Sequence, residues 1–318
     1  MSTERVRGRF APSPSGRMHL GNVASSLVAW LSAKSAGGVI VLRIEDLDRG
    51  RCTREYAEQI ARDFERLGLC WDEGGLCDGY MQSGCDDYYL SVLERISAVA
   101  TVYPCFCTRA ELHAASAPHA SDGTPIYDGR CKRLSTAERE RMLAERPAAL
   151  RVEVPDREYS FDVRRLGRIS QNLARECGDF VLRRSDGIFS YQLAVVADDI
   201  RMGVTEVVRG RDLADSTPRQ LYLYDLLDAS PPEYLHTPLL VAPDGKRLSK
   251  REKSLDLGRL FEISTPERII GELAWRLGII DRSEPVAPTE ILGEFSREKL
   301  VRGDITIDER EFLEHIAR

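Results

Sequence analysis

The stretch Arg9-Phe-Ala-Pro-Ser-Pro-Ser-Gly-Arg-Met-His-Leu-Gly-Asn22 decides how this chain folds. A short run of alternating apolar and polar residues from Val6 to Ala11 predicts a strand that leads into it, and helical periodicity from Gly21 to about Ser35 follows. The β-branched run at residues 39–44 predicts a second strand. A strand, a helix and a strand joined in this way form a right-handed crossover between parallel strands, which opens a nucleotide-binding α/β fold.

The loop between the first strand and the helix has the features of a phosphate site. Two prolines stiffen it, and Gly16 and Gly21 allow the backbone to approach a ligand. The helix that follows presents unpaired N–H groups and the positive end of its dipole to an anion. His19, at the helix entry, could donate to phosphate oxygens as charge develops on them. A loop of this kind alone is often a plain turn, but the complete string is far more specific.

The composition excludes several classes of protein. The chain has 318 residues, 42% hydrophobic and 30% charged, which is enough for one large domain or two and too polar for a membrane protein. The N-terminus lacks an apolar core and a small-residue cleavage site, so we expect no secretory signal and a cytoplasmic protein. We also expect no membrane partner, since no run of about 18 apolar residues occurs, and a monomer. A net charge of −6 argues against non-specific coating of nucleic acid, yet a local basic face could still bind RNA.

Composition and periodicity divide the chain into four parts. Helical patterns at residues 54–67 and 86–100 continue the first part, and Cys, Pro, Gly and Arg with short strand-like pieces then predict an insertion. Regular α/β patterning returns later, with a strand at residues 205–208, and the last part is expected to be helical. The four parts are the first half of the nucleotide-binding fold (1–102), the insertion (103–178), the second half (179–242) and the C-terminal subdomain (243–318).

A second motif, Arg247-Leu-Ser-Lys-Arg251, lies at the other end of the α/β unit. Alone it would be a solvated basic loop. Together with the first motif it resembles class I glutamyl-type aminoacyl-tRNA synthetases. Their adenylate-forming site opens with an Arg-Phe-Ala-Pro-Ser strand end and a His-Ile-Gly-His-like signature, and it carries a Lys-Met-Ser-Lys-Ser-like mobile loop. The resemblance covers most of the chain and implies a Rossmann catalytic fold with a parallel sheet.

The resemblance assigns ATP chemistry to both motifs. It implies that ATP, with Mg²⁺, is bound by His19, Gly21, Asn22 and Lys250. His19 and Lys250 would be catalytic, since Lys250 is placed to neutralise pyrophosphate as it leaves. Arg247 stands where the family has lysine, which keeps the charge and alters its geometry. The expected signature loop comprises Arg247, Leu248, Ser249, Lys250 and Arg251.

The sequence Arg43-Ile-Glu-Asp-Leu-Asp48 ends the second strand, where an open parallel sheet places its ligands. Glu45 faces that crevice if the alternation holds; otherwise it is a surface acid. The resemblance implies that Glu45 receives the amino group of an amino acid, and that Tyr191 and Arg209 are further contacts. Two converging arginines favour glutamate over glutamine. The expected glutamate-binding residues are Arg9, Phe10, Ala11, Pro12, Ser13, Glu45, Tyr191 and Arg209.

The insertion contains Cys105-Phe-Cys107 and, after 19 residues, Tyr127-Asp-Gly-Arg-Cys131. Three thiolates and a fourth donor can form a closed tetrahedral zinc site, although spacing alone also allows three reduced structural cysteines. Glutamyl-Q tRNA(Asp) synthetases, short relatives of glutamyl-tRNA synthetase, carry a similar Cys-x-Cys, spacer, Tyr-x-x-x-Cys pattern. The resemblance therefore implies one structural Zn²⁺ per chain, with His113 or His119 as alternatives for the fourth ligand. The expected ligands are Cys105, Cys107, Tyr127 and Cys131.

The length of the chain after the signature loop favours that short family. Only 67 residues follow Arg251, which we expect to be too few for a helical anticodon-binding domain. The resemblance then implies that glutamate is placed on queuosine in the anticodon loop, with ATP, L-glutamate and tRNA(Asp) carrying queuosine as partners. One alternative is a truncated enzyme that charges the 3′ end of a tRNA. Another is a non-catalytic RNA- or amino-acid-binding paralogue, against which the complete set of His19, Glu45, Arg209 and Lys250 argues.

Overall fold

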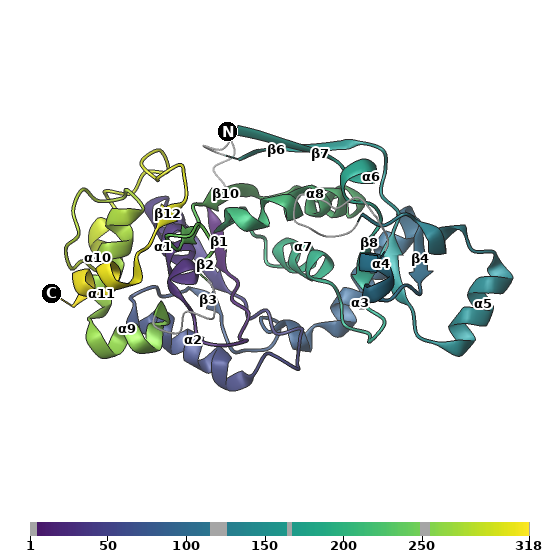
Figure 1. Ribbon diagram of the computed structural model, residues 1–318, viewed down its shortest axis with the longest axis horizontal. Helices are drawn as coiled ribbons and strands as arrows, with labels where there is room; N and C mark the ends of the chain where they lie inside the picture. The colour runs from purple at the N-terminus through teal and green to yellow at the C-terminus, as the bar shows by residue number, and fades with distance from the viewer. Residues whose placement is uncertain (1–4, 115–125, 164–166, 249–254, 318) are drawn as a thin grey trace.

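A layer of parallel strands lies next to the C-terminal helices, in the left half of Figure 1. The computed structural model describes residues 5–114, 126–163, 167–248 and 255–317. Strands β1 (Arg7–Phe10), β2 (Val39–Leu42) and β3 (Glu73–Gly74) form one parallel sheet, and β9 (Glu206–Gly210) pairs in parallel with β10 (Glu233–Thr237). Thr205 joins the two sheets, because its N–H donates to the Arg7 carbonyl over 2.9 Å. The resulting order is β3-β2-β1-β9-β10.

The predicted strand–helix–strand unit at the N-terminus is confirmed. Helix α1 (Leu20–Ser35) connects β1 to β2 and buries ten of its residues. Its end is set by Gly37, whose φ is +66°. Gly38 then lets the chain return close to the first strand, since a Cβ at this position would lie 2.3 Å from the Val6 carbonyl oxygen.

Further helices cover the parallel layer and hold two hydrophobic cores. The larger core joins α1 and the β1–β2 region to the C-terminal helices. The second core forms where α3, α7 and α8 meet the insertion. These helices are α2 (Arg54–Arg66), α3 (Asp86–Val99), α7 (Tyr191–Arg201) and α8 (Thr217–Leu226). In Figure 1, α7 and α8 lie in the middle of the view and α2 lies along its lower edge.

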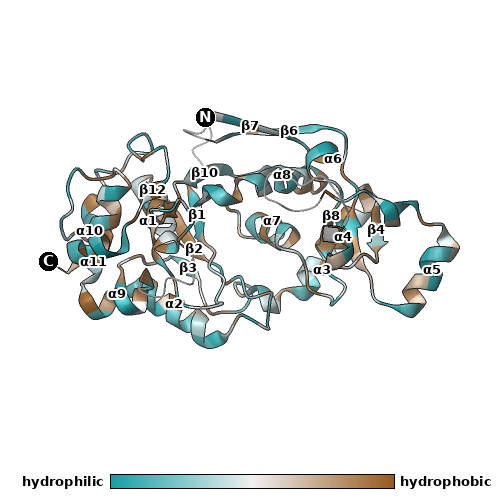
Figure 2. Ribbon diagram, viewed as in Figure 1, coloured by the Kyte–Doolittle hydropathy of each residue, from teal (hydrophilic) through white to brown (hydrophobic). Residues whose placement is uncertain are grey.

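The insertion is built around an antiparallel sheet. Strands β4 (Val102–Cys105), β5 (Ala149–Val152) and β8 (Phe180–Arg183) pair in that order. β8 begins just after the expected boundary at residue 178, yet its partner is β5 and not a strand of the parallel layer. The remaining elements are the hairpin β6 (Glu158–Val163) and β7 (Gly167–Asn172), and the helices α4 (Arg109–Ala114), α5 (Thr136–Glu145) and α6 (Leu173–Glu176). Helix α5 buries no residue and is mostly teal in Figure 2.

The C-terminal part is helical, as predicted, with one added strand. It contains α9 (Leu257–Ile263), α10 (Pro266–Arg276), α11 (Glu309–Ile316) and β12 (Ile305–Thr306), which pairs with β11 (Leu240–Val241). Figure 1 places these helices at the opposite end of the long axis from the insertion. Among the described residues, no helix combines the length and hydrophobicity that a transmembrane span requires.

Candidate active site

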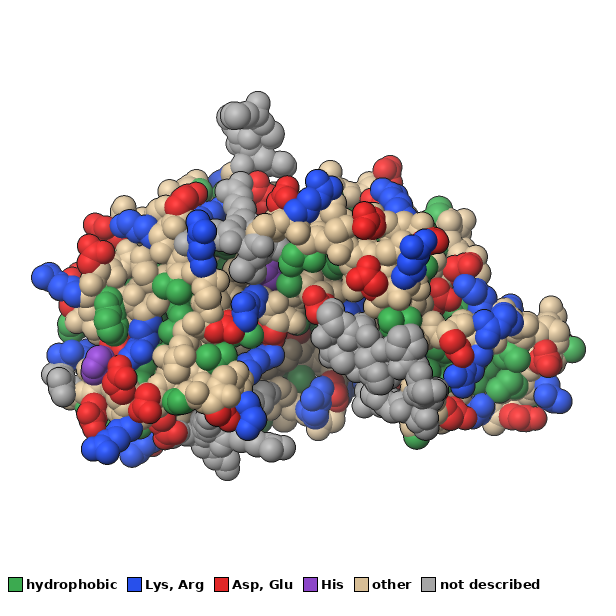
Figure 3. Space-filling view, turned by 45° about the horizontal axis from the view of Figure 1, so that its top comes forward, with side chains coloured by type: hydrophobic (Ala, Val, Ile, Leu, Met, Phe, Trp, Pro, Cys, Tyr) green, Lys and Arg blue, Asp and Glu red, His purple; other side chains and the backbone are tan. Residues whose placement is uncertain are grey.

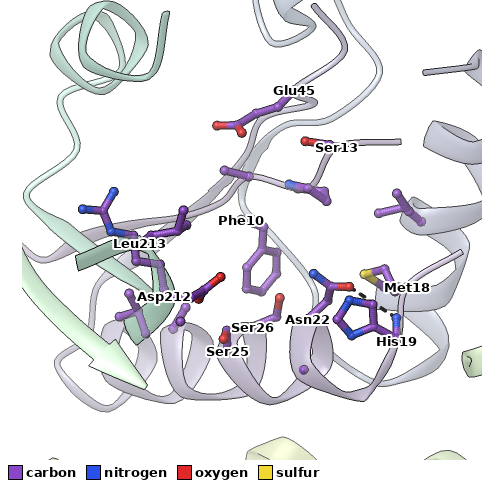
Figure 4. Close-up of a pocket in the computed structure, with 18 of the residues that line it drawn as sticks. Phe10, Ser13, Met18, His19, Asn22, Ser25, Ser26, Glu45, Asp212 and Leu213 are labelled. Atoms are coloured by element: carbon purple, nitrogen blue, oxygen red, sulfur yellow. Dashed lines mark hydrogen bonds between the residues drawn. The ribbon is translucent and has the colours of Figure 1, made fainter. Parts of the chain in front are cut away.

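A cavity of about 510 Å³ opens at the carboxyl ends of β1, β2 and β9, where a parallel sheet places its ligands. Figure 4 shows Glu45 and Ser13 on one side of it, Asp212 and Leu213 on another, and His19 with Asn22 at the start of α1. Every predicted ATP- or glutamate-site residue that the structure describes lines this cavity: Arg9, Phe10, Ala11, Pro12, Ser13, His19, Gly21, Asn22, Glu45, Tyr191, Arg209, Arg247 and Leu248.

The start of α1 borders the cavity with its positive end. His19 occupies the N-cap, in an extended conformation, and its backbone N–H donates to Asn22 Oδ1 over 3.3 Å. A Cβ on Gly21 would lie 3.2 Å from His19 Cε1 and 3.3 Å from Nδ1. Glycine at position 21 thus leaves room for the imidazole over the first turn of the helix. This end of the cavity can bind a phosphate group.

Glu45 is held by a buried arginine. Arg43 is completely buried, and its Nη2 donates to Glu45 Oε1 over 3.0 Å while its Nη1 donates to Asp199 Oδ1 over 2.6 Å. Burial raises the pKa of Glu45, and the charge of Arg43 opposes that rise. The carboxylate is therefore oriented before a ligand arrives, and it can accept hydrogen bonds from an ammonium group.

Arg9 and Tyr191 lie next to this ion pair. Arg9 is 6% exposed; its Nη1 donates to the Val208 carbonyl over 3.0 Å, and its Nε lies 3.8 Å from Asp199 Oδ1. Burial raises the pKa of Tyr191, and the charges of Arg209 and Arg9 act against that rise. The Tyr191 hydroxyl is thus a neutral hydrogen-bonding group close to both arginines.

The Arg209 guanidinium is clamped from behind. Its Nη1 donates to Gln220 Oε1 over 2.9 Å, its Nη2 to Thr217 Oγ1 over 2.7 Å, and its Nε to His236 Nε2 over 3.3 Å. A guanidinium has five N–H donors, so one on each Nη has no partner among the described residues. Two such donors match the oxygens of a carboxylate.

The described base of the signature loop is anchored at the mouth of the cavity. Arg247 forms an ion pair with Asp212, which belongs to the 3₁₀ helix η3 (Arg211–Ser216) after β9. Leu248 is buried. The other expected loop residues, Ser249, Lys250 and Arg251, lie outside the described residues.

Sequence reasoning missed the residues that support the site. Arg43, Asp199 and His236 are buried and reach the ligand-facing residues, and Asp212 lines the cavity itself. One signal was available for Asp199, since adjacent acids within the apolar pattern of a helix indicate buried partners. His236 lies on β10, a strand that we did not predict, because Tyr-Leu-His-Thr has no regular alternation.

Comparison with known proteins agrees with this geometry. A family model described as tRNA synthetases class I (E and Q), catalytic domain, matches residues 5–286. A glutamyl-Q tRNA(Asp) synthetase of Nitratidesulfovibrio vulgaris is 48% identical over 92% of this chain and 92% of its own length. The chain belongs to the glutamyl-Q tRNA(Asp) synthetase family. It is thus a ligase of the class I synthetase type.

Other members and one solved structure extend the comparison. The glutamyl-Q tRNA(Asp) synthetase of Symbiobacterium thermophilum is 45% identical over 94% of this chain and 95% of its own length. The crystal structure of a glutamate tRNA ligase from Elizabethkingia meningosepticum, in complex with its amino acid, is 30% identical with a TM-score of 0.82. It matches 97% of this chain, and this chain matches 68% of it.

In this glutamyl-Q tRNA(Asp) synthetase family member, the insertion gathers three cysteines. The sulfur atoms of Cys105, Cys107 and Cys131 lie within 4.8 Å of one another, and those of Cys107 and Cys131 are 3.6 Å apart. Two sulfurs that each lie about 2.3 Å from a tetrahedral zinc ion are about 3.8 Å apart. The cluster could therefore hold a metal ion.

Tyr127 lies at the same cluster. Its hydroxyl accepts a hydrogen bond from the Cys131 backbone N–H over 2.9 Å, and the Arg151 guanidinium carbon lies 4.1 Å from its ring centroid. Burial would raise the pKa of Cys105, but Arg151 reverses this and lowers it, which favours a thiolate. His119 and the side chain of His113, the alternative fourth ligands, lie outside the described residues.

Proposed function

We propose that this protein activates L-glutamate with ATP as glutamyl-adenylate and transfers the glutamyl group to queuosine in the anticodon loop of tRNA(Asp). The observation that carries the proposal is the sequence identity of 48% and 45% with two glutamyl-Q tRNA(Asp) synthetases, compared with 30% for the glutamate tRNA ligase. The match spans 92% of this chain and 92% of the Nitratidesulfovibrio vulgaris protein.

The arrangement of charges supports glutamate as the amino acid. Glu45 faces the cavity as a partner for the ammonium group, and Arg209 offers two N–H groups to the side-chain carboxylate, with Arg9 nearby. A glutamine carboxamide would bring an NH₂ group against one of these donors and leave a buried N–H unpaired. Such mismatches discriminate strongly in a buried site.

The chemistry proceeds in two transfers. A carboxylate oxygen of glutamate attacks the α-phosphorus of ATP, and the bond to the bridging oxygen breaks, which releases pyrophosphate. A hydroxyl of the queuosine cyclopentene ring then attacks the activated carbonyl carbon; the bond to AMP breaks, and the hydroxyl proton leaves to solvent. The protein orients the reactants and needs no nucleophile of its own.

His19 and Lys250 have the roles of charge stabilisers in this proposal. His19 and the start of α1 face the phosphates from the first motif, and Lys250 would meet the leaving pyrophosphate. Mg²⁺ bound with ATP offsets phosphate charge. An unstacked base in an RNA loop can enter a cavity of this kind, whereas a base inside a duplex cannot. The face in Figure 3 carries basic and acidic side chains side by side.

The cysteine cluster has a structural role in the proposal. Cys105, Cys107, Cys131 and Tyr127 hold one Zn²⁺, which fixes the segment 126–133 against β4. Cys131 Sγ already accepts a hydrogen bond from the Phe106 N–H over 3.4 Å, so the two arms of the cluster are in contact. A closed four-ligand site leaves no position for a substrate.

Labelled glutamate tests the proposal. The protein is incubated with ATP, Mg²⁺ and tRNA(Asp) from cells that do or do not make queuosine, and the product is mapped by nuclease digestion. We expect label on the anticodon fragment, only when queuosine is present. Label on the 3′-terminal adenosine would instead establish charging of the tRNA end, and no glutamate-dependent ATP–pyrophosphate exchange would indicate a non-catalytic paralogue.

A further inference from the structure

His236 lies directly behind Arg209 on the neighbouring strand. The parallel register of β9 and β10 pairs these two residues, and Arg209 Nε donates to His236 Nε2 over 3.3 Å. The two residues are 4% and 6% exposed. Arg209 is among the described residues that line the cavity, whereas His236 is not. Any effect of His236 on a ligand in the cavity therefore passes through Arg209.

Aromatic rings fix the imidazole in this position. The ring of Tyr234 stacks on that of His236, with centroids 6.2 Å apart and planes inclined by 13°. The guanidinium carbon of Arg209 lies 5.1 Å from the same Tyr234 ring. Phe161, on strand β6 of the insertion, covers both rings with its centroid 6.0 Å from each. The imidazole is therefore enclosed between Phe161, Tyr234 and Arg209.

The hydrogen bond from Arg209 requires a neutral imidazole. Burial, together with the charges of Arg209 and Arg9, lowers the pKa of His236 to about 3. Since Nε2 accepts, the single ring hydrogen lies on Nδ1, which is buried and has no partner among the described residues. An unpaired buried N–H destabilises a fold. For stability alone, a phenylalanine ring would thus serve better at this position.

We infer that His236 is a positioning residue: it accepts the Nε–H of Arg209 and so holds the guanidinium with its two remaining N–H groups toward a substrate carboxylate. The inference rests on the proposed function, since it requires Arg209 to bind the side chain of glutamate. It adds a determinant of selectivity that lies outside the cavity.

The position of this contact predicts which kinetic constants depend on it. The side-chain carboxylate of glutamate does not react, so its contact with Arg209 acts equally in the bound substrate and in the transition state. Loss of such a contact raises the KM for glutamate and leaves kcat and the KM for ATP nearly unchanged. General damage to the fold would change all three.

Two substitutions separate the acceptor from the ring. His236→Phe keeps a ring on Tyr234 and removes the acceptor, and His236→Gln keeps an acceptor near the place of Nε2 and removes the ring. In glutamate-dependent ATP–pyrophosphate exchange, we expect His236→Phe to raise the KM for glutamate about tenfold and to reduce the preference for glutamate over glutamine. His236→Gln should stay within about threefold of the wild type, and His315→Gln on helix α11 is the matched control.

The outcomes separate this inference from the proposed function. If the wild-type protein shows no glutamate-dependent exchange, the proposed function fails before any variant is made. If the wild type is active and folded His236→Phe keeps its KM for glutamate, or loses kcat and ATP binding to the same degree, the positioning role is wrong. If His236→Phe does not fold, His236→Asn replaces it, because the shorter side chain places its acceptor too far from Arg209. Equal KM values for glutamate in the Asn and Gln variants would then overturn the inference.

Discussion

Arg43 donates a hydrogen bond to Asp199 over 2.6 Å at a place where the two side chains are only 0% and 5% exposed. The same guanidinium contacts Glu45, and Asp199 lies 3.8 Å from Arg9. A buried chain of alternating charges, Arg9–Asp199–Arg43–Glu45, thus joins two cavity-lining side chains that we propose as partners for opposite charges of the amino acid. Asp199 and Arg43, which do not line the cavity, thus fix the positions of two residues that do.

Replacing Arg43 with Met should lower the free energy of unfolding by about 3–5 kcal/mol, because buried carboxylates would lose their counter-charge. Arg49→Met is the matched control, since the pair of Arg49 with Asp86 is exposed and spans 3.6 Å. We expect that control to change stability by less than about 1 kcal/mol. Urea denaturation measures both, and equal effects would show that the buried chain has no special weight.

Replacing Gly21 with Ala should slow glutamate activation. The new Cβ would lie 3.2 Å from His19 Cε1, so the imidazole must shift by a few tenths of an ångström. We expect a rate roughly tenfold to a hundredfold lower, because a misplaced catalytic group loses most of its effect. Gly84→Ala is the control, as no described atom lies within 4 Å of the place that its Cβ would take. A Gly21→Ala enzyme with normal kcat would remove His19 from the mechanism.

Metal analysis of the purified protein should find one zinc per chain. Cys107→Ser should lose the metal, since the site would keep only two thiolates. Cys70→Ser, an exposed cysteine outside the cluster, should retain it. Tyr127→Phe should bind zinc more weakly than the wild type in a chelator competition. A never-chelated wild-type protein without zinc would show that the cysteines are only packed together.

The KM for glutamate should rise at acidic pH. Burial raises the pKa of Glu45 above its ordinary value of 4.5, so the carboxylate is protonated, and loses its attraction for an ammonium group, at a higher pH than an exposed glutamate. Below that pKa we expect the KM to increase about tenfold per pH unit. Glu45→Gln should have a higher KM for glutamate than the wild type at neutral pH and should not show this rise at acidic pH. The variant therefore distinguishes titration of Glu45 from titration of the substrate.

His236 should make stability depend on pH. Its pKa is lowered from 6.5 to about 3, so between these values the unfolded chain binds a proton that the folded protein does not. The neutral imidazole therefore contributes its full share to the free energy of unfolding above pH 6.5, and this share is lost as the pH falls toward 3. We expect the free energy of unfolding, measured by urea denaturation at several pH values, to rise less steeply with pH in His236→Phe than in the wild type. The difference should reach about 1.4 kcal/mol per pH unit between pH 3 and 6.5. The same dependence of the free energy of unfolding on pH in both proteins would contradict this prediction.

Local patterns made the first part of the fold predictable from the sequence. The β-branched run of β2 favours a strand, and the glycines at 37 and 38 favour a helix end, through local sequence alone. The cavity residues of the first motif and Glu45 could be predicted for a related reason, since they lie in continuous motifs at the ends of β1 and β2. Tyr191 and Arg209 could be predicted only from the family resemblance. Strand β8 shows the limit of this reasoning: its sequence indicates a strand, but nothing local tells it to pair with β5.

The support of the site could not be predicted because it depends on distant pairs. Arg43 and Asp199 are separated by 156 residues, and their contact forms only when β2 and α7 are packed together. The clamp on Arg209 needs His236 from a second strand and Gln220 from a helix. Such side chains belong to no sequence motif. Arg, Asp, His and Gln are common on protein surfaces, so the sequence does not indicate that these four are buried.

The pairing of Thr205 with Arg7 can form only late during synthesis on the ribosome. The two residues are 198 positions apart, and until Thr205 has emerged the open side of β1 has no partner strand. At roughly 5–20 residues per second, that interval lasts about 10–40 s. During this time the nascent chain exposes a strand edge to its neighbours on the same messenger, so slowing of translation within the insertion would lengthen its exposure to misassembly.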